Sequence, residues 1–288
     1  MKKLLFSMLS ILIITVCCSC NNSENTSEVE NNSESYKSPL EIVSELTVIE
    51  EGTELSQLQE MGLLNLEAIG INVGEYSYEG HFDAVMHGDY CLTDNSDNPV
   101  IVRYQYTNEL HESILVDKYG RLLSAKLNDD SNVSQSVLSE NELIEVASDC
   151  ATRALGDKFQ GYSVYKVSYS DYDSNATIYW NKEGKERFGD LITIGLTNKG
   201  YIYRIGANYS DLPDNYSYQE IDKIAEKWFE ENLKKIYPET ESYVVDKNSV
   251  ENIDGKVYGD YVATINVAAG GHSCVQLIVQ DMPANESE

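Results

Sequence analysis

The chain has 288 residues, and its 48 Asp and Glu outnumber its 21 Lys and Arg, which gives a formal net charge of −27. Phosphate repels a polyanion of this density, and no run of Lys and Arg along the sequence offers a local footprint, which argues against nucleic acid as a partner. The same charge disfavours anionic lipid headgroups, so attachment to a membrane requires acyl chains rather than a basic surface.

The N-terminus has the pattern of a secretion signal. Lys2 and Lys3 precede an apolar run from Leu4 to Val16. A membrane-spanning helix needs roughly 17 to 25 apolar residues, so this run is too short to be an anchor helix. The segment therefore predicts export rather than a transmembrane anchor.

The end of this run resembles a bacterial lipobox, because Cys20 follows the small residue Ser19. The resemblance implies that residues 1–19 are a lipoprotein signal peptide and that Cys20 carries the lipid. The mature protein would then be extracytoplasmic, lipid-anchored to the bacterial cell membrane, with a net charge of −29 after loss of two lysines. Because Cys17 stands where the motif usually has Leu or Val, Cys17 and Cys18 remain alternative lipidation sites.

Residues 20–37 predict a flexible tether. They are almost devoid of apolar side chains and cannot contribute to a core. A flexible coil of about 17 residues spans on the order of 20 to 25 Å, which is enough to hold a folded domain clear of the lipid headgroups.

The remaining chain predicts an α+β fold made of repeated units, each with one helix packed on an antiparallel β-meander. Two units, 139–210 and 217–282, open with the same Ser-x-x-Glu capping box. A divergent and longer unit, 38–130, precedes them. We expect a second helix in that unit from Leu55 to Ile69, and strands at 76–92 and 100–106.

Turn residues separate the expected strands. Asp117-Lys118-Tyr119-Gly120 and Thr197-Asn198-Lys199-Gly200 are each flanked by apolar, strand-like runs, and both end in Gly, which tolerates a positive φ. Gly156 and Pro238 are expected to end the helices that begin after Ser139 and Ser217.

A helix followed by three or four antiparallel strands with an Asn-Lys-Gly or Asp-Lys-x-Gly hairpin, repeated in a secreted lipoprotein, resembles PepSY-type and related cystatin-like modules. The resemblance covers roughly residues 139–281 and, less closely, 38–130. It implies a noncatalytic unit that binds or restrains another protein at the cell surface. The family has no active-site residues to transfer to this chain.

The sequence gives little support for catalysis, a metal or a cofactor. The run Gly270–Cys274 reads as a hairpin turn, because neighbours on a strand point to opposite faces and cannot pair as nucleophile and base. His81 and His87 could converge with nearby Asp residues, but we expect them to face solvent. Asp171–Asn175 begins like a calcium loop and lacks the required turn Gly.

Three cysteines, Cys91, Cys150 and Cys274, would remain beyond the lipidated one. Their odd number excludes a disulfide framework and leaves one bridge possible. Cys150 falls at an apolar helix position and is expected to behave as a small buried hydrophobe.

The compositional excess is tyrosine, with 21 Tyr against 5 Phe. Half-buried sheet faces account for such an excess; alternatively it forms a recognition surface. The best local concentration is Tyr162, Tyr169, Tyr172, Tyr179 and Trp180. The leading hypothesis is a noncatalytic envelope protein that binds or regulates another envelope protein or a peptide. The alternative is a carbohydrate- or peptidoglycan-binding module that uses these aromatic residues.

Overall fold

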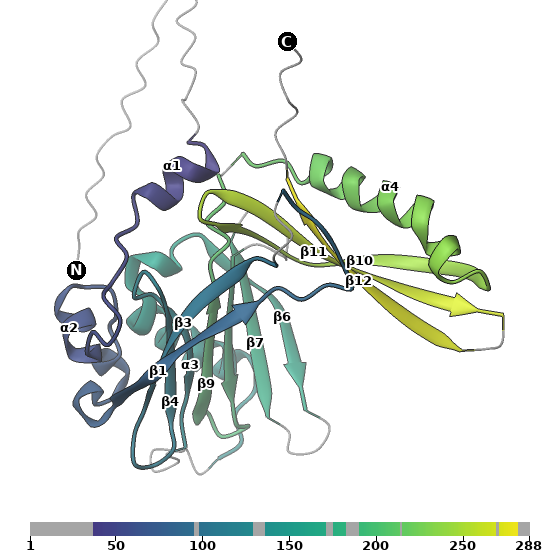
Figure 1. Ribbon diagram of the computed structural model, residues 1–288. Coiled ribbons are helices and arrows are strands. Elements are labelled where there is room, and N and C mark those ends of the chain that lie inside the picture. The colour runs from purple at the N-terminus through teal and green to yellow at the C-terminus, as the bar shows by residue number, and fades with distance from the viewer. Residues whose placement is uncertain are drawn as a thin grey trace, which may run out of the picture. The chain divides into compact units, whose positions relative to one another are not determined.

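The computed structural model describes residues 37–94, 98–128, 136–170, 175–182, 190–213, 215–268 and 271–281. Two β-sheets dominate it (Figure 1). The larger sheet is antiparallel throughout and contains eight strands in spatial order: β1 (Ser77–Val85), β3 (Val100–Thr107), β4 (Ser113–Asp117), β5 (Leu122–Lys126), β9 (Ile202–Asn208), β8 (Leu191–Leu196), β7 (Ala176–Lys182) and β6 (Tyr162–Tyr169).

The smaller sheet has four strands. Three form an antiparallel meander, and the short β2 joins it in parallel beside β12. In spatial order the strands are β10 (Thr240–Ile253), β11 (Lys256–Val267), β12 (His272–Gln280) and β2 (Tyr90–Leu92).

The helices are fewer and mostly short. Only α3 and α4 exceed two turns. The α-helices are α1 (Pro39–Ser44), α2 (Leu55–Glu60), α3 (Glu140–Leu155) and α4 (Gln219–Ile236), and the 3-10 helices are η1 (Glu67–Ile69), η2 (Val73–Glu75) and η3 (Gly156–Phe159). No helix in the described ranges is long and apolar enough to cross a membrane.

One face of the large sheet forms the main core. Strand residues alternate between the two faces, and the inward set is aliphatic or aromatic, as with Ala176, Ile178 and Trp180 of β7. Helices α2 and α3 and the 3-10 turns bury their apolar side chains on this face. Helix α3 begins at Ser139, whose backbone N–H donates to Glu142 at 2.7 Å, as the capping box predicts.

A second core lies between α4 and the small sheet (Figure 1). Helix α4 presents one apolar stripe, Ile221, Ala225, Phe229 and Leu233, each at most 1% exposed. These side chains pack on β11 and β12. Helix α4 is therefore amphipathic, with its buried residues spaced four apart.

The predicted fold class, repeated helix-on-meander units, is wrong. Strand β5 pairs with β9 over Ser124–Lys126, so strands from two expected units form one continuous eight-stranded sheet. Strand β2, from the N-terminal segment, completes the sheet of the C-terminal segment. Backbone groups at a meander edge need partners, and here other segments supply them, which local sequence patterns do not reveal.

Three local expectations also differ. The helix expected over 55–69 stops at Glu60, because Gly62 adopts a positive φ of 73° and η1 forms separately. The strand expected over 76–92 divides into β1 and β2, which join different sheets. Helix α4 lacks the capping box at Ser217; its N-cap is Tyr218, without a side-chain cap bond.

The three cysteines in the described ranges, Cys91, Cys150 and Cys274, are free thiols. Cys150 is buried, as expected from its place on α3. Desolvation raises the pKa of its thiol to about 12, so it stays protonated at neutral pH.

Candidate functional site

Strands β5–β9 contain no Asp or Glu, although 48 of the 288 residues are acidic. They carry four cations instead. Their inward side chains belong to the core, and the alternate residues form what we call the outer face. The central part of this face, to which the name refers below, consists of Ser124, Lys126, Tyr165, Lys166, Thr177, Tyr179, Thr193, Gly195, Tyr203, Arg204 and Gly206.

A bulge in β6 places Tyr165 and Lys166 together on the outer face. The register shifts between Val164 and Lys166, so Tyr165 is the extra residue. Both side chains reach Tyr179 of β7: the Tyr165 and Tyr179 ring centres lie 5.9 Å apart, edge to face, and Lys166 Nζ lies 5.6 Å from the Tyr179 ring. Tyr165 is 43% exposed, so this group is open to a ligand.

A second bulge, in β9, repeats the arrangement. The register shifts so that Tyr203 is the extra residue and Arg204 lies opposite Gly195. The Tyr203 ring lies across Gly195, because a Cβ added at Gly195 would meet that ring at 2.8 Å. Gly195 also lies opposite Thr177, which shares a face with Tyr179. Both bulges therefore present a Tyr–cation pair on the same side.

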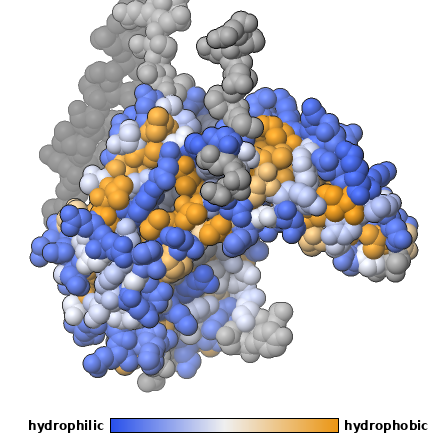
Figure 2. Space-filling model, viewed as in Figure 1, coloured by the Kyte–Doolittle hydropathy of each residue, from blue (hydrophilic) through white to orange (hydrophobic). Residues whose placement is uncertain are grey.

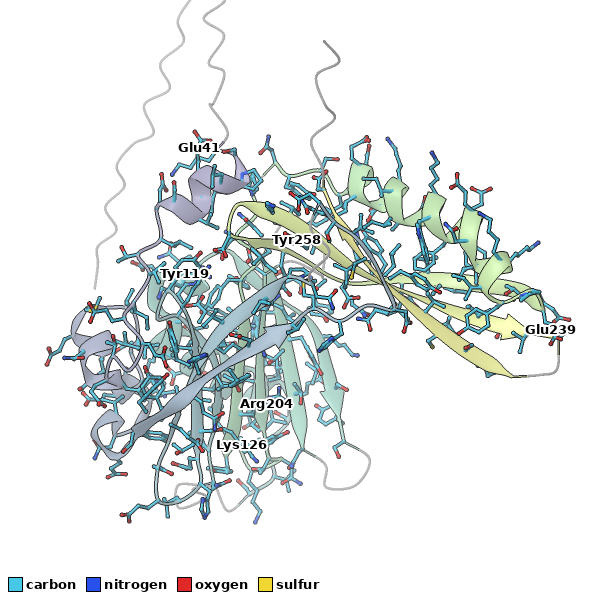
Figure 3. All side chains as sticks on the ribbon, viewed as in Figure 1. Glu41, Tyr119, Lys126, Arg204, Glu239 and Tyr258 are labelled. Atoms are coloured by element: carbon cyan, nitrogen blue, oxygen red, sulfur yellow. The ribbon has the colours of Figure 1, made fainter. Side chains whose placement is uncertain are left out.

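Lys126 of β5 lies directly opposite Arg204 of β9. Both side chains are exposed, and Figure 3 shows them close together on the large sheet. Every ion pair within the described residues involves other side chains, so these two cations have no acidic partner there. The fold thus creates a basic surface that no run of sequence shows.

The outer face combines groups that commonly bind ligands. It offers three tyrosine rings, three cations and small hydroxyl or glycine residues between them. It has no carboxylate, imidazole or thiol among its defining residues. In Figure 2 the lower part of the large sheet is mostly hydrophilic, whereas hydrophobic residues gather near the upper ends of β1 and β3.

The structure separates the aromatic residues that the sequence suggested. Tyr179 lies on the outer face. Trp180 follows it on the same strand, points into the core and is only 2% exposed, so it cannot contact a ligand. Tyr162 packs against Phe159 at 5.9 Å, and burial raises its pKa.

The remaining predicted residues lie elsewhere. Tyr169 is 48% exposed at the end of β6, where its hydroxyl donates to Glu140 at 2.9 Å; desolvation and this hydrogen bond raise its pKa. Tyr172 and Cys20 fall outside the described residues. Sequence reasoning missed Tyr165, Tyr203 and the surrounding cations. The lack of acidic residues from 162 to 170, 175 to 182 and 191 to 208 was the signal that could have found them.

Two pockets are alternative candidates to the outer face. A cavity of about 470 Å³ lies among η1, η2, α3 and β9. Its buried carboxylate, Glu112, accepts hydrogen bonds from the Tyr76 hydroxyl, Asn108 Nδ2 and the Asn128 backbone, each at 2.7 Å. These donors join three segments, so the carboxylate has a structural role.

The second pocket is a cleft of about 60 Å³ between the β4–β5 turn and the β10–β11 turn. Arg121 lines it and forms ion pairs with Asp117 and Asp211, with N–O distances of 2.6 Å. Lys118 pairs with Asp254 at its edge. The volume suffices for a few water molecules, so the cleft favours a structural bridge over a ligand site.

Comparison with known proteins adds no assignment: no model of a protein family, no curated protein and no solved structure matches this chain. The resemblance to PepSY-type modules therefore stays a prediction. The outer face, identified from strand register, ring contacts and charge, is the best candidate functional site.

Proposed function

We propose that this chain is a noncatalytic, lipid-anchored protein of the bacterial cell envelope that binds an envelope carbohydrate polymer on its outer face. The observation that supports this is the set of Tyr165, Tyr179 and Tyr203, spaced by small and hydroxyl residues. Sugar rings present apolar C–H faces that pack on aromatic rings, while their hydroxyl groups bond to polar side chains. A broad face with small residues between the rings suits an extended polymer.

Binding without cleavage is supported by the absence of acids from β5–β9. Most glycoside hydrolases need two carboxyl groups across the scissile bond. Neither a carboxyl pair nor a single carboxyl group is available among the outer-face residues. On the described residues of β5–β9 a sugar chain would therefore meet binding groups and no general acid.

A protein or peptide partner, the leading hypothesis from the sequence, has one supporting observation. Strand β6 ends the large sheet and pairs only with β7 among the described strands. Its Val164 and Tyr165 are 39% and 43% exposed. An extended peptide could add to such an edge through main-chain hydrogen bonds. This second candidate predicts that Val164→Pro blocks capture of a protein from solubilised membranes.

Tyrosine variants test the carbohydrate proposal. We expect Tyr165→Ala and Tyr203→Ala each to weaken binding to purified envelope glycan about three- to tenfold, because each removes one aromatic contact. Tyr243→Ala is the matched control, since Tyr243 is exposed on β10 of the other sheet. The measurement is a binding isotherm on washed glycan. Wild-type affinity in both outer-face variants would contradict the proposal.

The anchor is tested separately. Cys20→Ala is expected to release the protein from the membrane fraction or leave it unprocessed, because the thiol that carries the lipid is lost. Fractionation and metabolic labelling with a fatty acid report the result. Unchanged labelling of Cys20→Ala would mean that Cys17 or Cys18 carries the lipid. Alanine variants of these two cysteines would then identify which one.

A further inference from the structure

Lys126 and Arg204 carry the same charge and lie directly opposite each other on neighbouring strands, which needs an explanation. Like charges directly opposite on neighbouring strands destabilise a sheet. Acidic residues are abundant in this chain, yet within the described residues none pairs with either cation. A bound anion between the two side chains would remove the repulsion and satisfy both groups.

We infer that the bound polymer is an anionic glycan, one that carries phosphate or carboxylate groups, and that Lys126 and Arg204 together hold one of these groups. This inference rests on the proposed carbohydrate binding. Arg offers a planar fork of donors that matches both anions, and Lys adds a compact charge. Both cations are exposed and can reach a ligand that lies on the sheet.

A third cation extends the site across the strands. Lys166 of β6 is separated from Arg204 of β9 by three strand spacings, roughly 14 Å. Tyr179 and Tyr203 belong to the strands between or beside these charges. The pattern is cation, aromatic rings, cation, which suits a polymer with repeated negative groups better than a single small anion.

The net charge of the whole chain restricts where an anionic polymer can bind. With a net charge of −27, most of the protein surface repels an anionic polymer. Strands β5–β9, without a single Asp or Glu, are an exception. An anionic glycan would therefore be confined to the outer face, and its orientation would be set by the positions of the three cations.

The test compares an anionic glycan with its neutral match and with a phosphate-bearing polymer. The probes are polygalacturonate, its methyl ester as the neutral match, and poly(glycerol phosphate) as the phosphate source. We expect the full chain to bind at least one charged polymer, and Lys126→Glu to weaken that binding tenfold or more, since the site loses one cation and gains an anion. Affinity for the methyl ester should stay unchanged. The relative affinities of the two charged polymers identify the preferred anion.

Lys227→Glu is the control, because it makes the same charge change on an exposed lysine of α4, outside the outer face. It should leave all affinities as in wild type. Lys126→Glu should melt no lower than wild type, because an opposite-charge pair replaces a like-charge pair. Arg204→Gln, which removes a cation without adding an anion, provides a second variant.

The outcomes separate the two proposals. Equal binding of acid and methyl ester, lost in Tyr203→Ala and unaffected by Lys126→Glu, would overturn the anionic ligand and leave carbohydrate binding intact. Failure to bind any of the glycans, including washed envelope glycan, would overturn both. If poly-glutamate binds as tightly as the charged glycans and depends equally on Lys126, the ligand class is an acidic peptide and the inference is wrong.

Discussion

Replacing Arg121 with Met is expected to lower the free energy of unfolding by about 3–5 kcal/mol, because removing one partner of a buried ion pair leaves the others uncompensated. Arg121 Nε donates to Asp117 at 2.6 Å, and its two terminal nitrogens donate to Asp211 at 2.6 and 2.7 Å. The three side chains are only 12%, 8% and 13% exposed. Burial alone would lower the pKa of Arg121, but the bonds to Asp211 and Asp117 raise it.

The surrounding structure explains why this bridge matters. The guanidinium lies 5.1 Å from the Tyr119 ring and 4.4 Å from the Tyr209 ring. Arg121 connects the β4–β5 turn to Asp211, which lies in the segment between β9 and α4. The loss of Arg121 would therefore leave two carboxylates in a cleft lined by aromatic rings.

Urea unfolding at neutral pH measures the effect. Arg153→Met is the matched control, because Arg153 is 51% exposed and pairs with Asp149 on the surface of α3. It should cost no more than about 1 kcal/mol. Changing Asp117 and Asp211 to Asn in the Arg121→Met background should recover part of the loss. Equal costs for the two arginine variants would contradict a buried bridge.

Ala225→Asp is expected to destabilise the protein by a few kcal/mol, because the new carboxylate would be buried without a partner. Ala225 has no exposed surface and lies in the middle of the apolar stripe of α4. Thermal or urea unfolding followed by circular dichroism measures the change. The effect should be largest at neutral pH, where the introduced carboxyl group would have to be charged.

Glu226→Ala serves as the comparison on the same helix. Glu226 is exposed, and its side chain makes no ion pair within the described residues, so the expected change is within about 0.5 kcal/mol. Small, equal effects at both positions would show that α4 does not pack on the small sheet through Ala225.

Local features were predictable from the sequence because a few neighbouring residues determine them. The Ser139–Glu142 box and Gly156, with a φ of 55°, bound helix α3 as expected. Hairpin turns form where Gly120 and Gly200 adopt positive φ. The same reasoning failed for α4, whose residue pattern matched a capping box that the backbone does not form at Ser217.

Long-range pairing was not predictable from these patterns. The β5–β9 and β2–β12 pairs join segments that no turn connects, so nothing in their local sequence specifies them. The candidate site depends on this pairing, since Lys126 and Arg204 meet only because β5 and β9 are neighbours. Tyr179 and Trp180 show the opposite case, where sequence neighbours are separated by strand alternation.

The parallel pairing of β2 with β12 constrains the order in which the chain can fold. Tyr90, Cys91 and Leu92 align with Leu277, Ile278 and Val279, near the opposite end of the chain. During synthesis, β1, β2 and β3 emerge long before β12 exists. Closing so long a loop carries an entropic cost, and contacts of this sequence separation slow folding. Strand β2 therefore has no partner strand until β12 is available, which makes its pairing a late step of folding.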